Sequence, residues 1–407
     1  MTFRHWAATL ALLLLAAGAA FLASGNALGG PATPPAALQE TVLPPPRPQA
    51  QGRLPRVAIV AHNSNTELTD FVVPYGILQR SGAAEVWALG VEPSPIQLFP
   101  AFRVEPDAGI DAFDARHPDG ADYVIVPAVH EDSDPRLLAW VQSQWRKGAT
   151  VIGVCDGVWV LARAGLLDGR RATSHWYSRD ALARQFPGTQ WVSGQRYVVD
   201  QRIVTTTGVS ASIPASLALV QTLAGPQRAQ ALARELGAAG WDTAHPSAEF
   251  RLTARHLATA AGNWLAFWGH ERLQAALTPG GDDVALALVA DAYARSYRTT
   301  VDSVSSGPAT VRMASGLVFL PDTVRPPSTP SNTSALPRPT APAVAALDQA
   351  LVDIGQRYGQ GTAAFVALQL EYPAGALARS INAAAATPAP APAAAKTAGS
   401  TAENPWD

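Results

Sequence analysis

The residue best suited to chemistry is Cys155, the single cysteine among 407 residues. It lies in the segment TVIGVCDGVWVLA, where a short apolar run passes abruptly into a helix-like run. A side chain at such a turn reaches the carboxyl edge of a parallel sheet, where open α/β folds bind their ligands. The turn also places Cys155 at a helix N-terminus, which favours a thiolate. Asp156 either opposes that effect as a neighbouring anion or serves only as a first-turn helix residue.

Other chemistry has little support in the sequence. There is no HExxH, no paired CxxC and no glycine-rich phosphate loop. We therefore expect no metal and no cofactor. His175 and His130 are the histidines expected nearest the thiol, in a catalytic or a structural role.

The elements around Cys155 alternate between strand and helix. Short apolar runs at 56–61, 84–89, 122–126 and 150–154 predict strands, and 70–81, 134–147 and 212–224 predict helices. Apolar strands that alternate with helices are typical of a parallel sheet covered on both faces. The sequence therefore predicts an α/β fold with a parallel sheet sandwiched by helices.

A longer stretch carries a family resemblance. Residues 153–176, GVCDGVWVLARAGLLDGRRATSHW, resemble the cysteine-containing block of the ThiJ/PfpI superfamily. The resemblance covers about residues 54–225 and is nearest to isocyanide hydratases and to the sensor-like domains of AraC-type regulators. It implies a flavodoxin-like fold and, since many members pair, a possible homodimer.

The resemblance also implies roles for particular residues. In the family an acidic residue four positions before a proline approaches the cysteine, and Asp70 has that spacing, with Glu67 a weaker candidate. His175 occupies a position that faces the cysteine in some relatives, and Trp176 follows it. Gly208 lies in a loop that resembles the one before the family's last helix.

Three departures from the family pattern bear on activity. The usual Pro-Gly-Gly after the third strand, which supplies oxyanion donors, is replaced by a segment that includes Val129 and His130. Asp156 stands where protease-like members have histidine, so peptidase activity is not expected. Pro214 stands where many relatives carry an acidic residue.

The two ends of the chain differ from the middle. Residues 1–25 contain an apolar run preceded by Arg4 and predict a signal peptide or a membrane anchor. The protein is then anchored in the inner membrane facing the periplasm, or is released there if the segment is cleaved. Residues 26–53 predict a Pro-rich linker.

The rest of the chain predicts a mostly helical extension. Its expected parts are helical residues 226–321, a disordered linker at 322–342, a helix at 343–372 and an Ala/Pro-rich disordered tail at 373–407. Residues 226–321 contain eight arginines, no lysine and eight acidic residues. A DNA-binding domain needs a basic face, so no nucleic-acid partner is expected.

Three functions remain open from the sequence. Cys155 and Asp70 could act on a small electrophile as a hydratase or lyase, with hydration of an isocyanide or a ketoaldehyde implied by resemblance. The same pocket could bind a small-molecule ligand, or the thiol could be oxidised, in a non-catalytic sensing module. A scaffold domain with a vestigial cysteine is the third reading.

Overall fold

The computed structural model describes residues 42–48, 52–238, 242–325 and 333–386. The expected signal or anchor at 1–25 and most of the linker at 26–53 lie outside these residues. Within the described ranges no helix is both long enough and apolar enough to span a bilayer.

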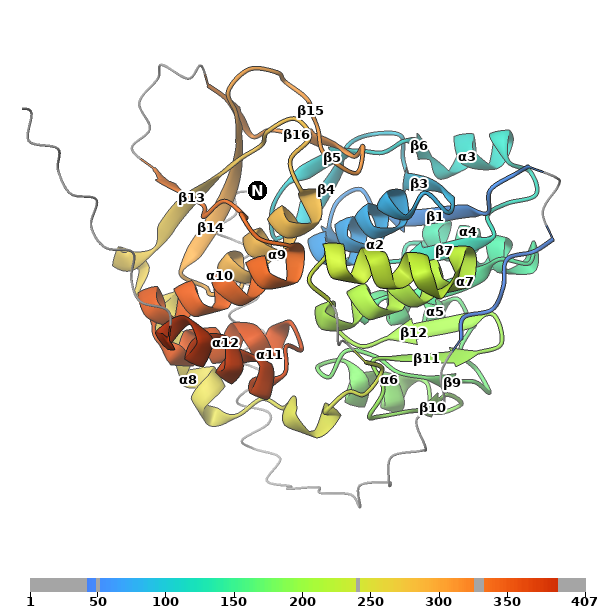
Figure 1. The fold of residues 1–407 in the computed structure, drawn as a ribbon. Coiled ribbons are helices and arrows are strands. Elements are labelled where there is room, and N and C mark those ends of the chain that lie inside the picture. The colour runs from blue at the N-terminus through green and yellow to red at the C-terminus, as the bar shows by residue number, and fades with distance from the viewer. Residues whose placement is uncertain (1–41, 49–51, 239–241, 326–332, 387–407) are drawn as a thin grey trace, which may run out of the picture.

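A seven-stranded sheet forms the centre of the N-terminal half (Figure 1). Its strand order is β11-β12-β8-β7-β1-β3-β6, and every pair is parallel except β11 with β12. The bounds are β1 Arg56–Ala61, β3 Glu85–Gly90, β6 Ala108–Gly109, β7 Tyr123–Val126, β8 Thr150–Gly153, β11 Tyr197–Asp200 and β12 Ile203–Thr206. The predicted parallel sheet is confirmed.

Both faces of this sheet are covered by helices, as the apolar runs predicted. Strand β1 shows why, because Val57 and Ile59 face one core while Ala58 and Val60 face the other. The first core is closed by α2 (Leu68–Ser81) and α7 (Val209–Glu235). The second core is closed by α3 (Ile110–Arg116), α4 (Pro135–Arg146) and α5 (Val158–Arg163). It also contains Ala172 of β9 (Arg171–Ala172) and Leu182 of α6 (Arg179–Gln185), and β9 pairs with β10 (Gln190–Trp191).

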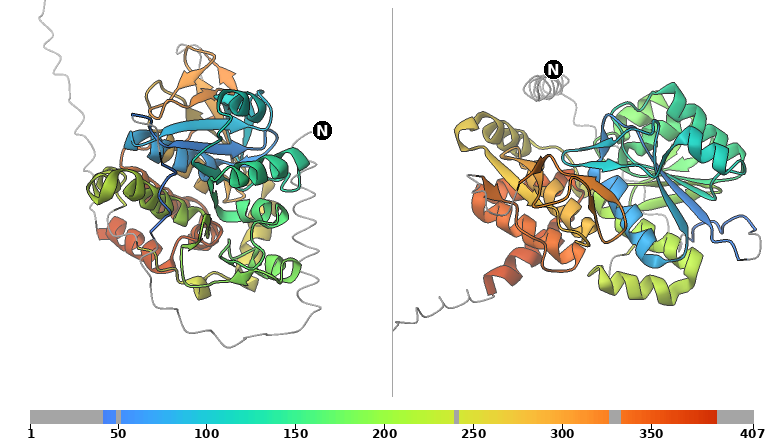
Figure 2. Two further views of the ribbon diagram at one scale, coloured as in Figure 1. Left: turned by 90° about the vertical axis from the view of Figure 1, so that its right-hand side faces the viewer. Right: turned by 90° about the horizontal axis from the view of Figure 1, so that it is seen from above.

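The C-terminal half is helical, as expected, and also contains a parallel sheet that the sequence did not predict (Figure 2). Strands β13 (Glu271–Ala276) and β14 (Thr299–Ser305) pair in parallel and are joined through α9 (Asp283–Ala294). Short strands β17 (Thr323–Val324) and β18 (Ser334–Ala335) flank them. The helices are α8 (Ala254–Leu265), α10 (Ala343–Tyr358), α11 (Gln360–Gln369) and α12 (Ala374–Ala386).

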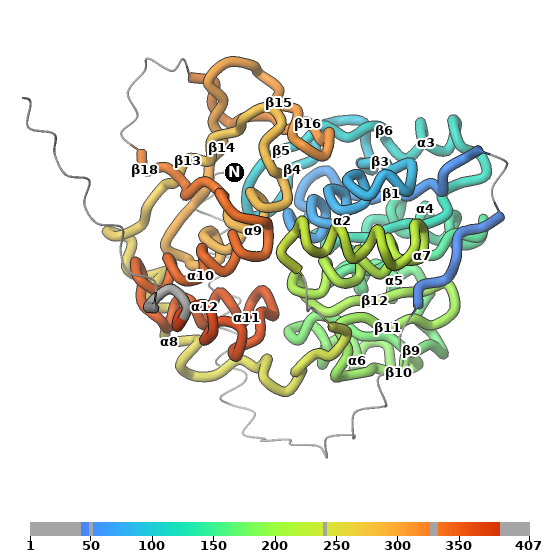
Figure 3. The backbone as a smooth tube through the Cα atoms, in the orientation of Figure 1, coloured from blue at the N-terminus to red at the C-terminus, as the bar shows by residue number. Residues whose placement is uncertain are grey.

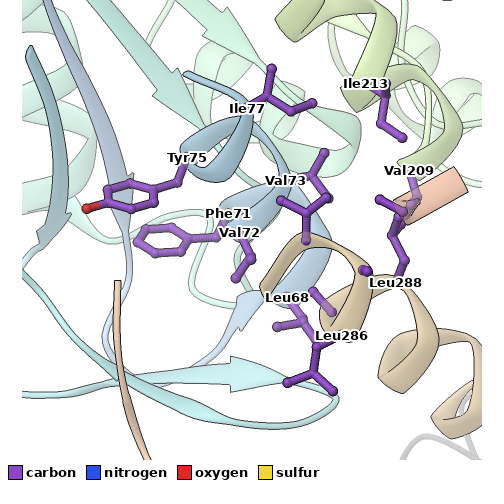
Figure 4. Close-up of a cluster of buried hydrophobic side chains, with 14 of the residues drawn as sticks. Leu68, Phe71, Val72, Val73, Tyr75, Ile77, Val209, Ile213, Leu286 and Leu288 are labelled. Atoms are coloured by element: carbon purple, nitrogen blue, oxygen red, sulfur yellow. The ribbon is translucent and has the colours of Figure 1, made fainter. Parts of the chain in front are cut away.

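Helix α9 joins the two halves through a shared core. Figure 4 shows Leu286 of α9 beside Leu68 of α2 and Leu288 of α9 beside Val209 of α7, and all four are buried. Helix α10 packs on the other side of α9. The two halves therefore share one continuous apolar core.

A second sheet also crosses the expected domain boundary. Its order is β15-β16-β5-β4-β2, with bounds β15 Val311–Arg312, β16 Val318–Leu320, β5 Arg103–Glu105, β4 Ile96–Phe99 and β2 Thr66–Glu67. Strand β16 pairs antiparallel with β5, so a strand from the extension completes a sheet of the N-terminal half.

The helices in the second half of the chain have other limits than the sequence predicted. Helix α7 is interrupted at Gly225, and α10 ends at Gly359, both with positive φ. Residues 374–386 form α12, where a disordered tail was expected; Ala-rich sequence has high helix propensity, and Leu377 is buried against the core. Of the expected linker at 322–342, residues 326–332 lie outside the described ranges.

Candidate functional site around Cys155

Cys155 occupies a strained turn between β8 and α5. Its φ is +54°, a conformation that non-glycine residues adopt rarely and that recurs at functional sites. A 3-10 turn, Cys155–Gly157, joins the strand to the helix. Gly157 makes the turn possible, because a Cβ there would lie 2.0 Å from the carbonyl oxygen of Val126 at the end of β7. The turn thus holds the thiol at the carboxyl edge of the sheet.

Asp70 lies in the first turn of α2, and its charge acts on the thiol, but no hydrogen bond joins the two side chains in the described part of the chain. Asp70 is fully buried, and its Oδ2 accepts a hydrogen bond of 3.2 Å from the Ala128 N–H. Its Oδ1 is buried and has no hydrogen-bond partner in the described part of the chain. Burial, followed by the charge of Glu67, raises the pKa of Asp70 well above its ordinary value.

Carboxyl groups surround the thiol. Burial raises the pKa of Cys155 well above its ordinary value, and four acidic residues add to the shift. They are Asp70, Asp156, Glu67 and Glu371, in decreasing order of effect. The helix terminus was expected to favour a thiolate, whereas the enclosed acidic surroundings keep the sulfur a neutral thiol at neutral pH.

The loop after β7 has few free oxyanion donors. The N–H of Ala128 donates to Asp70, and the N–H of His130 donates to the Asn65 carbonyl over 3.1 Å. Val129 is buried and bridges to Thr66. The His130 ring is exposed and packs on Phe99, with ring centroids 5.1 Å apart. The structure therefore does not place this ring at the thiol, and two backbone donors are already engaged.

The end of α11 closes the site. We call residues 368–372 the C-terminal arm; Figure 3 shows α11 on the side of the C-terminal helices that faces the seven-stranded sheet. His175 Nε2 lies 3.2 Å from the Gln369 carbonyl oxygen, and Trp176 Nε1 donates to the Leu368 carbonyl oxygen over 2.9 Å. Two predicted site residues therefore bind the arm, and Cys155, on whose thiol the Glu371 charge acts, is 8% exposed.

Glu371 of the arm lies deepest and is fully buried. Its carboxylate accepts hydrogen bonds from the Gly208 N–H over 2.6 Å and the Trp176 N–H over 2.7 Å. His245 Nε2 lies 3.2 Å from the same carboxylate. Its pKa falls to about 2 even though burial, the largest influence, acts to raise it; the interaction with His245 and the charge of His175 prevail.

A largely enclosed arginine at the C-terminus of α9 contacts the acidic cluster on its other side. Arg295 of α9 lies 2.6 Å from Glu67 and 2.8 Å from Asp291. Glu67 in turn caps α2 by accepting the Asp70 N–H over 2.7 Å. Sequence reasoning missed Arg295, Glu371 and His245. A readable signal existed for Arg295, since Asp291 and Arg295 stand four apart at the end of an otherwise apolar helix.

The match of the sequence to a family model gives the class of protein. Residues 55–222 match the model of the DJ-1/PfpI family, so the chain carries a DJ-1/PfpI domain. The resemblance noted for residues 54–225 is thereby confirmed. In the described part of the chain no group of three or more His, Cys, Asp or Glu residues is arranged to hold a metal.

Particular relatives share parts of this domain. The HTH-type transcriptional regulator CdhR of Pseudomonas aeruginosa is 41% identical over 95 residues, which are 23% of this chain and 28% of that protein. Isonitrile hydratase of Pseudomonas putida is 38% identical over 103 residues, 25% of this chain and 44% of that protein. The matches thus span less than half the length of either relative. The structure of Drosophila melanogaster DJ-1beta aligns with 20% identity and a TM-score of 0.41, covering 46% of this chain and 99% of that one.

Proposed function

We propose that the Cys155 site is a small-molecule binding and sensing module rather than a centre of turnover. The observation that carries the proposal is the closed state of the site, in which the arm covers a neutral, buried thiol. A neutral thiol is a poor nucleophile and a poor target for oxidants, because the thiolate is the reactive form. Ligand binding therefore fits the site better than redox sensing.

The loop after β7 supports the same proposal. Stabilising an oxyanion takes donors that are free to meet the developing charge. Here the Ala128 N–H is bound to Asp70 and the His130 N–H to Asn65. Two of the loop's N–H groups are therefore engaged, and the Val129 N–H between them is the donor that this loop has left for covalent chemistry at Cys155.

An assay of turnover tests this proposal. We expect the full-length protein to hydrate an isocyanide or a 2-oxoaldehyde no faster than its Cys155→Ser variant. A panel of small ligands should nevertheless raise its melting temperature, and should do so in the Cys155→Ser variant as well. Turnover that depends on Cys155 would reject the sensing function in favour of an enzyme.

A hydratase is the second candidate, favoured by one specific observation. The strained φ of Cys155 and the buried Asp70, whose pKa is raised, are an arrangement suited to a nucleophile and a carboxyl group that exchanges its proton. The similarity to isonitrile hydratase points the same way. This candidate requires that the arm open before each turnover.

Export and the absence of DNA binding complete the proposal. The apolar run in residues 1–25 supports placement outside the cytoplasm, by anchor or by cleaved signal. The balanced charge of residues 226–321 offers no basic face for DNA, although some relatives are named transcriptional regulators. Fusion of alkaline phosphatase after residue 53 should give active periplasmic enzyme, and an inactive fusion would refute export.

A further inference from the structure

We propose that the Glu371 carboxylate is an internal ligand that fills a carboxylate-binding niche beside Cys155, and that a small monocarboxylate from solution competes for the same niche. The inference rests on the proposed binding function and names its ligand class. The niche is formed by Gly208, Trp176 and His245, with His175 at its edge.

The donors of the niche belong to separate parts of the chain. Gly208 is the N-cap of α7, so its N–H lies at the positive end of a helix. Trp176 contributes its own N–H from the loop that follows β9. The His245 side chain is buried, and its Nε2 lies 3.2 Å from the carboxylate without a well-aligned hydrogen bond to it. Two N–H donors thus hold both oxygens of the carboxylate, and an imidazole lies close to it.

The backbone of the arm is strained in order to place Glu371 there. The Tyr372 N–H bonds to the Ala367 carbonyl oxygen, and the Glu371 N–H bonds to that of Leu368. This pair of bonds is a Schellman motif that places Glu371 at the position usually held by glycine, and its φ is +51°. A left-handed backbone is unfavourable for a glutamate, unlike for a glycine. The bonds of its carboxylate offset that cost.

The geometry explains how an outside ligand could act. Glu371 contributes to the raised pKa of Cys155, so the niche and the thiol share one site. A small carboxylate in the niche would release Glu371 and with it the arm. Because Asp70, Asp156 and Glu67 also border the thiol, a second negative charge on the ligand is disfavoured. The ligand class is therefore a monocarboxylate whose remainder is neutral or cationic.

The first test is chemical rescue in the full-length protein. In Glu371→Ala the niche is vacant, and we expect acetate to raise the melting temperature by about 2 °C or more. Acetamide and chloride at the same concentration should not raise it. The matched control is Glu249→Ala, which removes an exposed acid near His245 and should show no response to acetate.

The second test uses Cys155 as a reporter. Iodoacetate carries the carboxylate that the niche binds, whereas iodoacetamide is neutral. In Glu371→Ala the ratio of the iodoacetate to the iodoacetamide alkylation rate should rise about tenfold over wild type. In Glu249→Ala the ratio should stay at the wild-type value. An unchanged ratio in Glu371→Ala would overturn the proposal.

The wild-type protein gives a test that does not depend on folding of a variant. A tethered carboxylate has an effective concentration in the millimolar range, so acetate well above that level is required. It should speed amide hydrogen exchange in residues 360–372 more than acetamide does. Equal exchange with both solutes would overturn the proposal.

The outcomes separate the niche from the proposed function. Rescue by acetate together with Cys155-dependent turnover would leave the niche intact and reject the sensing function. Ligand-induced stabilisation without acetate rescue would reject the niche and leave the sensing function intact.

Discussion

The guanidinium of Arg295 lies 2.6 Å from the carboxylate of Glu67, a residue 228 positions earlier in the chain. Glu67 also binds the N–H of Asp70, so the C-terminal half reaches the acidic cluster at Cys155 through two contacts. The arm reaches the same site from another direction through Glu371. The family domain and the extension therefore build this site together.

Removal of Arg295 should destabilise the fold strongly. Arg295→Gln leaves the Glu67 and Asp291 carboxylates buried without their cation, and loss of one partner of a buried pair costs about 3–5 kcal/mol. Urea unfolding followed by fluorescence measures the change. Arg272→Gln is the control, because its pair with Asp302 is exposed and should contribute less than about 1 kcal/mol. Equal losses of unfolding free energy in Arg295→Gln and Arg272→Gln would show that Arg295 contributes no more than a surface charge.

The thiol should titrate above the ordinary cysteine range. Iodoacetamide alkylation of the full-length protein, which has no other cysteine, should show an apparent pKa above about 8.5. Asp70→Asn removes the largest charge effect that raises this pKa and should lower it. An apparent thiol pKa below the ordinary value, or one that Asp70→Asn does not change, would contradict the finding that acidic side chains raise the pKa of Cys155.

A methyl group at Gly208 should dislodge the arm. The added Cβ would lie 2.8 Å from the His175 ring and 3.1 Å from Glu371 Cγ. Gly208→Ala should therefore lower the melting temperature and speed alkylation of Cys155. Gly262→Ala in α8 is the matched control, since nothing lies within 4 Å of its Cβ and alanine favours the helix by up to about 1 kcal/mol. An unchanged rate of Cys155 alkylation in Gly208→Ala would mean that the site is already open in the wild-type protein.

Acid should selectively weaken the contribution of Glu371. Its folded-state pKa is about 2 against an ordinary 4.5, so the stabilisation is present above pH 4.5 and is lost as the pH falls toward 2. The shift corresponds to roughly 3 kcal/mol. The difference in unfolding free energy between wild type and Glu371→Gln should accordingly be large at pH 7 and should shrink toward pH 2. A difference that is constant with pH would assign Glu371 a role independent of its charge.

The sequence predicted the central sheet because its strands are short apolar runs separated by amphipathic helices. It also placed Asp70 near Cys155, since that relation follows from a family spacing. Strand β13 was missed because Glu271, Arg272 and Gln274 interrupt it, and six residues with two inward positions are a weak signal.

The closed site could not be read from the sequence for a different reason. Glu371 and Gly208 are 163 positions apart, and no periodic pattern connects them. Their contact depends on how α10 and α11 pack beside α9, which local propensity does not determine. A lone acid in the apolar stretch TAAFVALQLEY was the readable trace, and it indicates a buried partner without identifying it.

The pairing of β16 with β5 means that the family match and the folding unit have different limits. A fragment that stops at residue 225 would leave β5 as an open edge strand and would uncover the apolar faces of α2 and α7. Such a fragment should self-associate when it is expressed. The DJ-1/PfpI domain of this chain therefore cannot be transferred alone into another protein. Residues 226–372 have to be transferred with it.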